Sequence, residues 1–170
     1  MKYKAMPLKK VLMLLAILCM TSQLYGQWVS GIATSDPMTG EKVAYASSPW
    51  VRPNVEIPYG DIQAALVIYR KDEREWVSIV FSEDMDIENN FTYTWNIRTK
   101  WDDEITTTLA RIKHYTTAAI NMVGPDVISR IRRHDSIMVE LEFIGLGVRY
   151  FVFPLEGSSN AIEEMRTKLE

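Results

Sequence analysis

The segment FTYTWNIRT, residues 91–99, alternates strictly between apolar and polar side chains. Successive side chains of a strand point to opposite faces, so this pattern predicts a half-buried β-strand. Its apolar face must be covered by another layer of structure or by the curling of its own sheet. One face would carry Phe91, Tyr93, Trp95 and Ile97, and the other Thr92, Thr94, Asn96 and Arg98.

Similar runs of apolar or alternating residues, each ending at turn-forming residues, fill most of the chain. They predict strands over 28–35, 41–48, 62–70 and 75–82, one or two strands between 104 and 120, and a hairpin over 136–155. Gly145 and Gly147 permit the reversal of that hairpin. Between the second and third strands, residues 49–61 contain three prolines and a glycine, which predicts a loop or an edge excursion.

Two segments predict short helices. In the first, around 125–134, Pro125 suits the first turn and the apolar stripe consists of Val127, Ile128 and Ile131. In the second, around 158–169, Ser158 or Ser159 can cap the helix. The expected buried stripe of this second helix is Ala161, Ile162, Met165 and Leu169.

The expected fold is therefore mainly β, either an antiparallel β-sandwich or a strongly curved sheet, with two short helices. Residues 27–170 are long enough for one domain with a sizeable core.

The first 26 residues have the composition of a secretory signal peptide. Four lysines and no acidic residue precede VLMLLAILCM, an apolar run of ten that is shorter than the ~20 residues of a spanning helix. We expect cleavage after Gly26, a periplasmic or secreted protein, and membrane contact only through the cleaved signal. An uncleaved anchor is the alternative. Leu18 stands before Cys19 where a lipoprotein signal requires a small residue, which argues against lipidation.

Removal of the signal changes the chemistry open to the chain. Cys19 is the only cysteine, so the mature part would have no disulfide, thiolate nucleophile or cysteine metal ligand. Without its four lysines the count falls from 19 to 15 basic residues against 22 acidic ones, a net charge of −7. Such a balance argues against nucleic acid as a partner.

Few residues suggest catalysis or metal binding. Asp84, Asp86 and Glu88 alternate in SEDMDIENN and could converge on calcium, although the glycine and glutamate of an EF-hand loop are missing. A solvated acidic connection is the simpler interpretation. His114 and His134 stand alone in the sequence, and His134 at the end of a predicted helix is explained by the helix dipole. No cofactor is expected, since neither Gly-x-Ser-x-Gly nor a glycine-rich phosphate loop occurs.

The segment SDPMTGEKVA, residues 35–44, is predicted to connect the first two strands. Asp36 can accept a hydrogen bond from the N–H two residues on, and Gly40 can adopt the left-handed conformation that closes the loop. This turn does not require Met38 or Thr39, so these two residues are candidate partner contacts.

Three further residues are candidate partner contacts. Trp50 lies in the proline-rich segment, where a tryptophan is less easily explained by the core. Arg130 and Arg133 belong to RIRRHD, a basic patch that could dock an acidic partner or simply form a solvated helix face.

The order of these segments resembles the VasI proteins associated with bacterial type VI secretion and related exported proteins of unknown function. The resemblance rests on the Trp-led first strand, DPMTGEK, ALVIYR, FTYTWNIR and the ending FVFPLEGSSNAIEEMR, and spans residues 28 to 169. It implies an envelope-associated, non-enzymatic role. The family has a cysteine at the end of the LVIRC strand and of the last helix, plausibly a disulfide pair, whereas Arg70 and Leu169 stand near those places here.

Taken together, we expect an exported, non-enzymatic binding or accessory protein whose partner belongs to the envelope or to a secretion complex. One alternative is a hydrolase-like enzyme or calcium-dependent module built from Asp84, Asp86, Glu88 or His114. Another is a carrier of a small lipid or peptide. The sequence leaves the oligomeric state open.

Overall fold

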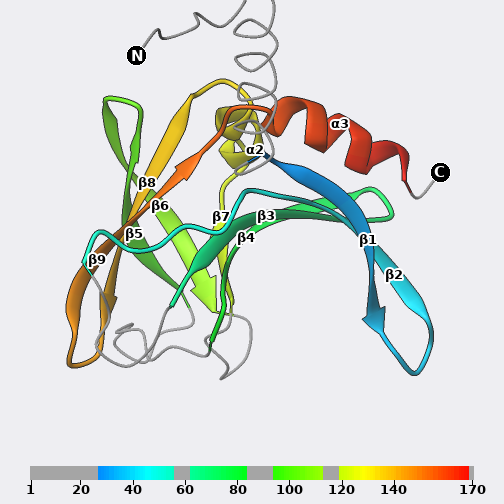
Figure 1. The fold of residues 1–170 in the computed structure, drawn as a ribbon, viewed down its shortest axis with the longest axis horizontal. Coiled ribbons are helices and arrows are strands. Elements are labelled where there is room, and N and C mark those ends of the chain that lie inside the picture. The colour runs from blue at the N-terminus through cyan, green and yellow to red at the C-terminus, as the bar shows by residue number, and fades with distance from the viewer. Residues whose placement is uncertain (1–26, 56–61, 84–93, 113–118, 169–170) are drawn as a thin grey trace, which may run out of the picture.

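The computed structural model describes residues 27–55, 62–83, 94–112 and 119–168. In this part of the chain, nine strands form one antiparallel sheet with the order β1-β2-β3-β4-β7-β6-β5-β8-β9 (Figure 1). The strands are β1 (Val29–Asp36), β2 (Glu41–Ser47), β3 (Ala64–Lys71), β4 (Arg74–Phe81), β5 (Thr94–Trp101), β6 (Glu104–Ile112), β7 (Ala119–Val123), β8 (Ser136–Phe143) and β9 (Gly147–Pro154). The helices are α2 (Val127–Ile131) and α3 (Ser158–Thr167).

The sheet curls strongly, which brings strands together that are distant in the strand order. The ring of Phe81 on β4 lies 5.9 Å from the ring of Phe151 on β9, measured between centroids. The segment after β2 links the two sides, since Val51 forms a bridge with Ala64 of β3 and Pro53 forms one with Phe151. Of the two predicted architectures, the strongly curved sheet is therefore the one observed.

The inner face of the curl, defined by the side of the sheet that carries Phe81 and Phe151, is filled with large side chains. Trp101, Phe143, Phe151 and Phe153 are each at most 1% exposed. The rings of Phe81, Phe143 and Phe151 pack edge to face, an arrangement that aromatic pairs prefer, and the ring of Phe153 stacks on that of Phe151. Without a disulfide, burial of this apolar surface is the main source of stability.

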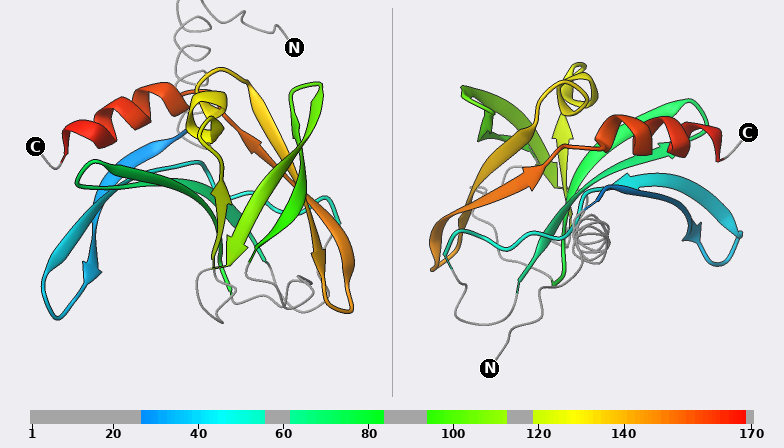
Figure 2. Two further views of the ribbon diagram at one scale, coloured as in Figure 1. Left: turned by 180° about the vertical axis from the view of Figure 1, so that it is seen from behind. Right: turned by 45° about the horizontal axis from the view of Figure 1, so that its top comes forward.

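The part of the sheet formed by β1, β2 and β3 extends away from the curl, and α3 covers its inner face (Figures 1 and 2). Small residues on the strands, Ala44 and Ala46, leave room for the helix. On α3, Ala161, Ile162 and Met165 are buried as the sequence pattern predicts, while Leu169 lies outside the described residues. Trp28 ties this region to the curl, because its indole Nε1 donates to the Pro154 carbonyl at 2.9 Å.

Most strands agree with the prediction to within two residues. In β5, Ile97 is buried and Thr94 and Asn96 are exposed, as the alternation predicts; residues 91–93 lie outside the described part. The segment 104–120 contributes two strands rather than one. The turn between β1 and β2 is also confirmed, since Asp36 accepts a 2.8 Å hydrogen bond from the Met38 N–H and Gly40 has a φ of 71°.

The predicted capping of the last helix is wrong. Gly157, with a φ of 84°, occupies the N-cap position, and no side chain caps the helix. The two serines instead donate to the end of α2: Ser158 Oγ to the Ile131 carbonyl at 3.0 Å, and Ser159 Oγ to the Arg132 carbonyl at 3.2 Å. The carbonyls at a helix C-terminus lack intrahelical donors, so they compete successfully for these hydroxyls.

Helix α2 is shorter than predicted, with five residues in place of about ten. Val127 and Ile131 are buried on the inner side, but Ile128 is only partly buried and reaches the surface. An isolated helix of this length is unstable in water, so α2 depends on its contacts with β4 and α3.

Truncation of the fully buried α3 residue, Ile162→Ala, should lower the free energy of unfolding by about 2–4 kcal/mol, because it removes core contacts and leaves a cavity. Urea unfolding followed by tryptophan fluorescence measures this loss. The matched control is Asn160→Ala on the exposed side of the same helix, expected to change stability by less than about 0.5 kcal/mol. Equal effects of the two changes would contradict the packing of α3 on the sheet.

Candidate functional site

A hollow lies where α2, α3 and the start of β4 meet. It is a groove of about 540 Å³, which we call the α2–α3 groove. Its surface is lined by apolar side chains from α2 and the turn before it, by arginines from α3 and from the residues that follow α2, and by one carboxylate. Its lining residues are Glu75, Pro125, Ile128, Ser129, Arg132, Arg133, Ser159 and Arg166.

One wall of the groove is fixed by an ion pair between α3 and β4. Arg166 binds Glu75 in a bidentate manner, with Nε–Oε1 and Nη2–Oε2 distances of 2.8 Å each. The guanidinium of Arg166 holds the pKa of the Glu75 carboxyl below its usual value, so this carboxylate is charged at neutral pH. Arg70 adds to the wall by donating from Nη1 to the Arg166 carbonyl at 2.8 Å.

The opposite wall carries two arginines with different freedom. Arg132 is paired with Glu163 of α3 at 2.8 Å, which ties the two helices together. Arg133 donates from Nε to the Ser129 carbonyl at 3.1 Å, and within the described residues no carboxylate lies at salt-bridge distance from it. The guanidinium of Arg133 therefore has donors left for a ligand on a positively charged wall.

A second hollow of about 270 Å³ adjoins the groove and shares Glu75 and Ile128 with it. Its lining includes Trp76, Val123 and the backbone at Gly124, so it is more apolar than the α2–α3 groove. The two hollows together offer a charged stretch beside an apolar one. Such a surface suits a ligand that has both acidic and apolar groups.

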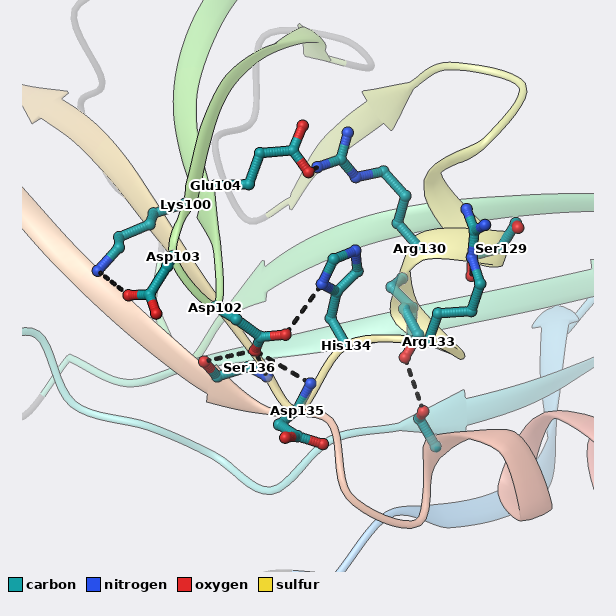
Figure 3. A network of polar contacts seen from close by, with 12 residues as sticks. Lys100, Asp102, Asp103, Glu104, Ser129, Arg130, Arg133, His134, Asp135 and Ser136 are labelled. Atoms are coloured by element: carbon teal, nitrogen blue, oxygen red, sulfur yellow. Dashed lines mark hydrogen bonds and ion pairs between the residues drawn. The ribbon is translucent and has the colours of Figure 1, made fainter.

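A polar network lies on the other side of α2 and centres on Asp102 and His134 (Figure 3). Asp102 Oδ2 is 2.9 Å from His134 Nδ1, and Asp102 Oδ1 accepts the N–H groups of Asp135 and Ser136 at 3.1 and 2.9 Å. The hydrogen bond from His134, followed by the backbone donors, lowers the pKa of the Asp102 carboxyl. Asp102 itself has a φ of 48°, an unusual conformation for a residue other than glycine.

This arrangement is similar to the imidazole–carboxylate pairs of general bases, but its contacts are those of a structural latch. Four donors converge on one carboxylate and join the β5–β6 turn to the chain that leaves α2. The prediction that His134 serves as a helix-end charge misses this partner, which no local sequence pattern indicates.

Arg130, a predicted partner contact, binds other residues of this chain. Its guanidinium lies 4.8 Å from the centre of the Trp101 ring, and its Nη2 is 3.0 Å from Glu104 Oε2 (Figure 3). Arg130 therefore holds α2 against the β5–β6 hairpin. Of the two arginines predicted to contact a partner, only Arg133 lines the α2–α3 groove.

The other candidate contacts lie apart from the α2–α3 groove. Met38 is 94% exposed, and Thr39 lies beside it at the tip of the β1–β2 hairpin, where its Oγ1 is 3.4 Å from the Glu41 nitrogen. Trp50 is 51% exposed in the segment that follows β2. The structure thus does not combine Met38, Thr39, Trp50 and Arg133 into one surface.

The candidate calcium ligands Asp84, Asp86 and Glu88, together with His114, lie outside the described residues. Within the described ranges, no group of three or more His, Cys, Asp or Glu side chains is placed to hold a metal ion. No helix in this part of the chain has the length and hydropathy needed to cross a bilayer.

The sequence matches no protein-family model and no curated protein. The fold is similar to the crystal structure of invasion associated protein B from Bartonella henselae, with a TM-score of 0.52 and 14% sequence identity. The match covers 83% of this chain and 91% of that one. At this identity the likeness concerns the fold alone.

The contacts of Asp102 predict that the stability lost in Asp102→Asn depends on pH. The folded pKa of Asp102 lies below its usual value of 3.8, so the carboxylate stabilises the protein above about pH 4 and loses this effect as the pH falls. The wild type should exceed the variant in unfolding midpoint at pH 7, and the difference should shrink below about pH 4. Urea unfolding across this range provides the measurement.

The matched control is Asp103→Asn, since Asp103 is fully exposed and its carboxylate forms an ion pair with Lys100 at 3.3 Å. This variant should follow the wild type throughout the pH range. An Asp102→Asn difference that persists unchanged in acid would show that the carboxylate charge is not what stabilises the latch.

Proposed function

We propose that the protein is an exported binding protein of the bacterial envelope that engages an acidic segment of another protein in the α2–α3 groove. The observation that carries this proposal is the groove itself, an open hollow in which Arg133 has no carboxylate at salt-bridge distance within the described residues, on a chain of net charge −3. The other two lining arginines, Arg132 and Arg166, pair with Glu163 and Glu75. Charge complementarity of this kind steers an acidic partner toward one part of an otherwise acidic surface.

The apolar lining supports a polypeptide in particular. Pro125 and Ile128 lie within the groove, and Trp76 and Val123 line the adjoining hollow. A polypeptide segment can place acidic side chains on Arg133 and an apolar side chain beside Ile128. A small inorganic anion would use only the first of these contacts.

Export and envelope association rest on the character of residues 1–26 and on the resemblance to the VasI proteins. A role beside a type VI secretion system rests on that resemblance alone. The carrier alternative gains no support from the interior of the curl, which is filled by Trp101, Phe143, Phe151 and Phe153. The enzyme and calcium alternatives depend on residues outside the described ranges.

The export proposal predicts processing of the chain. Protein isolated from the envelope or medium of producing cells should begin at or near Gln27, because a signal peptidase would remove the lysine-rich and apolar segments. Intact-mass measurement and N-terminal peptide mapping identify the first residue. A chain recovered from the cytoplasm with residues 1–26 intact would contradict the proposal.

The binding proposal predicts that Arg133→Glu lowers the affinity for the acidic partner. A photo-crosslinking side chain at Ser129 first identifies the partner in intact envelopes, and titration of that purified partner then measures affinity. Arg133→Glu should weaken binding about tenfold, on the order of 1.4 kcal/mol, because it reverses a charge that faces the ligand. The wild-type affinity should fall as salt is added.

Lys42→Glu is the matched control, since Lys42 is exposed on the β1–β2 hairpin and the substitution changes the net charge equally. It should leave the affinity unchanged. Equal losses in both variants would mean that net charge alone matters, and unchanged binding by Arg133→Glu would remove the groove from the interaction.

A further inference from the structure

The two edges of the nine-stranded sheet differ in their protection. At one edge, the segment after β2 covers β9: Pro53 bridges Phe151, and Asn54 exchanges hydrogen bonds with Tyr150 through its backbone N–H and its side-chain Oδ1. At the other edge, β1 pairs only with β2 within the described residues (Figure 1). An unpaired edge strand is a template for another strand.

The backbone groups that β1 turns outward follow from the hydrogen bonds of its neighbours. The Ser48 N–H donates to the Leu66 carbonyl, so the even-numbered residues of β2 face β3 and the odd-numbered ones face β1. The odd-numbered residues of β1 lie opposite these, at Val29, Gly31 and Ala33. The N–H and C=O groups of Ser30, Ile32 and Thr34 therefore point away from the sheet.

This edge lacks the features that usually block pairing. Residues 29–35, VSGIATS, contain no charged residue and no proline. The single irregularity in the pairing of β1 with β2 comes at the hairpin end, between Thr34 and Asp36. Natural edge strands normally carry an inward lysine, a proline or a central bulge for protection.

We propose that this edge pairs with the same edge of a second copy, so that two β1 strands join antiparallel about a two-fold axis at Ile32. Self-pairing is favoured because residues 29–35 are uncharged and bring no like charges together. In this register Ser30 lies opposite Thr34 of the partner subunit and Ile32 opposite itself. Each pair joins residues whose N–H and C=O groups point away from β2, as an antiparallel ladder requires.

The side chain of Ile32 supports this register. It lies on the inner face of the sheet, opposite Ala44 and on the same side as α3, yet it is 45% exposed. Pairing about the two-fold axis would place the two Ile32 side chains against each other and extend the apolar layer beneath α3 across both subunits.

The pairing of one strand buries less than the roughly 1,200 Å² typical of stable specific interfaces. The dimer is therefore expected to be weak and to depend on protein concentration. It involves β1 and does not depend on the α2–α3 groove, so either proposal can fail without the other.

Sedimentation equilibrium over a range of concentrations tests the dimer directly. The wild type should self-associate, and Ile32→Lys should weaken that association at least tenfold, because it places two like charges opposite each other. Ile105→Lys, at a 63% exposed site on β6, is the control and should self-associate as the wild type does. Circular dichroism confirms that each variant is folded.

A second measurement tests the register without disturbing the pairing. In a Cys19→Ser background, Ile32→Cys should form a disulfide-linked dimer when oxidised glutathione is added, since Cα atoms in a hydrogen-bonded pair are about 5.5 Å apart. Ile105→Cys should not. A wild type that stays monomeric at every concentration, or equal cross-linking at positions 32 and 105, would overturn the proposal.

Discussion

The need to bury one apolar face of a single sheet governs this structure. Over β4 to β9 the sheet curls until its own strands face each other, and Phe81 meets Phe151 across the interior. Over β1 to β3 the sheet is open, so α3 must supply the missing layer. The α2–α3 groove lies between the curled part of the sheet and the part covered by α3, because neither the curl nor the helix fills the space there.

Local patterns in the sequence were sufficient for most of the fold. Alternation predicted β5, and glycine and proline placed the turns, because the physics of both is local. The sequence could not distinguish a sandwich from a curled sheet, because that distinction depends on long-range contacts such as the Pro53–Phe151 bridge. The serines of α3 show the same limit. Instead of capping their own helix, they donate to carbonyls 27 residues earlier in the chain.

The candidate site was predicted only in part. A basic patch in RIRRHD is visible as a run of charge, and Arg133 does line the α2–α3 groove. Glu75 and Arg166, which form the other wall, are 91 residues apart and carry no local signal of their pairing. The same holds for Asp102 and His134, separated by 32 residues. Long-range ion pairs form only after the strands and helices have been placed, so periodicity cannot reveal them.

The bonds from Ser158 and Ser159 to the end of α2 have a consequence for the energetics of binding. With the Arg132–Glu163 pair, they join the end of α2 to α3 at three points beside the hollow. A ligand that enters it meets a preorganised surface and loses little free energy to ordering the backbone. A five-residue helix, too short to persist alone, is thereby held in place beside the α2–α3 groove.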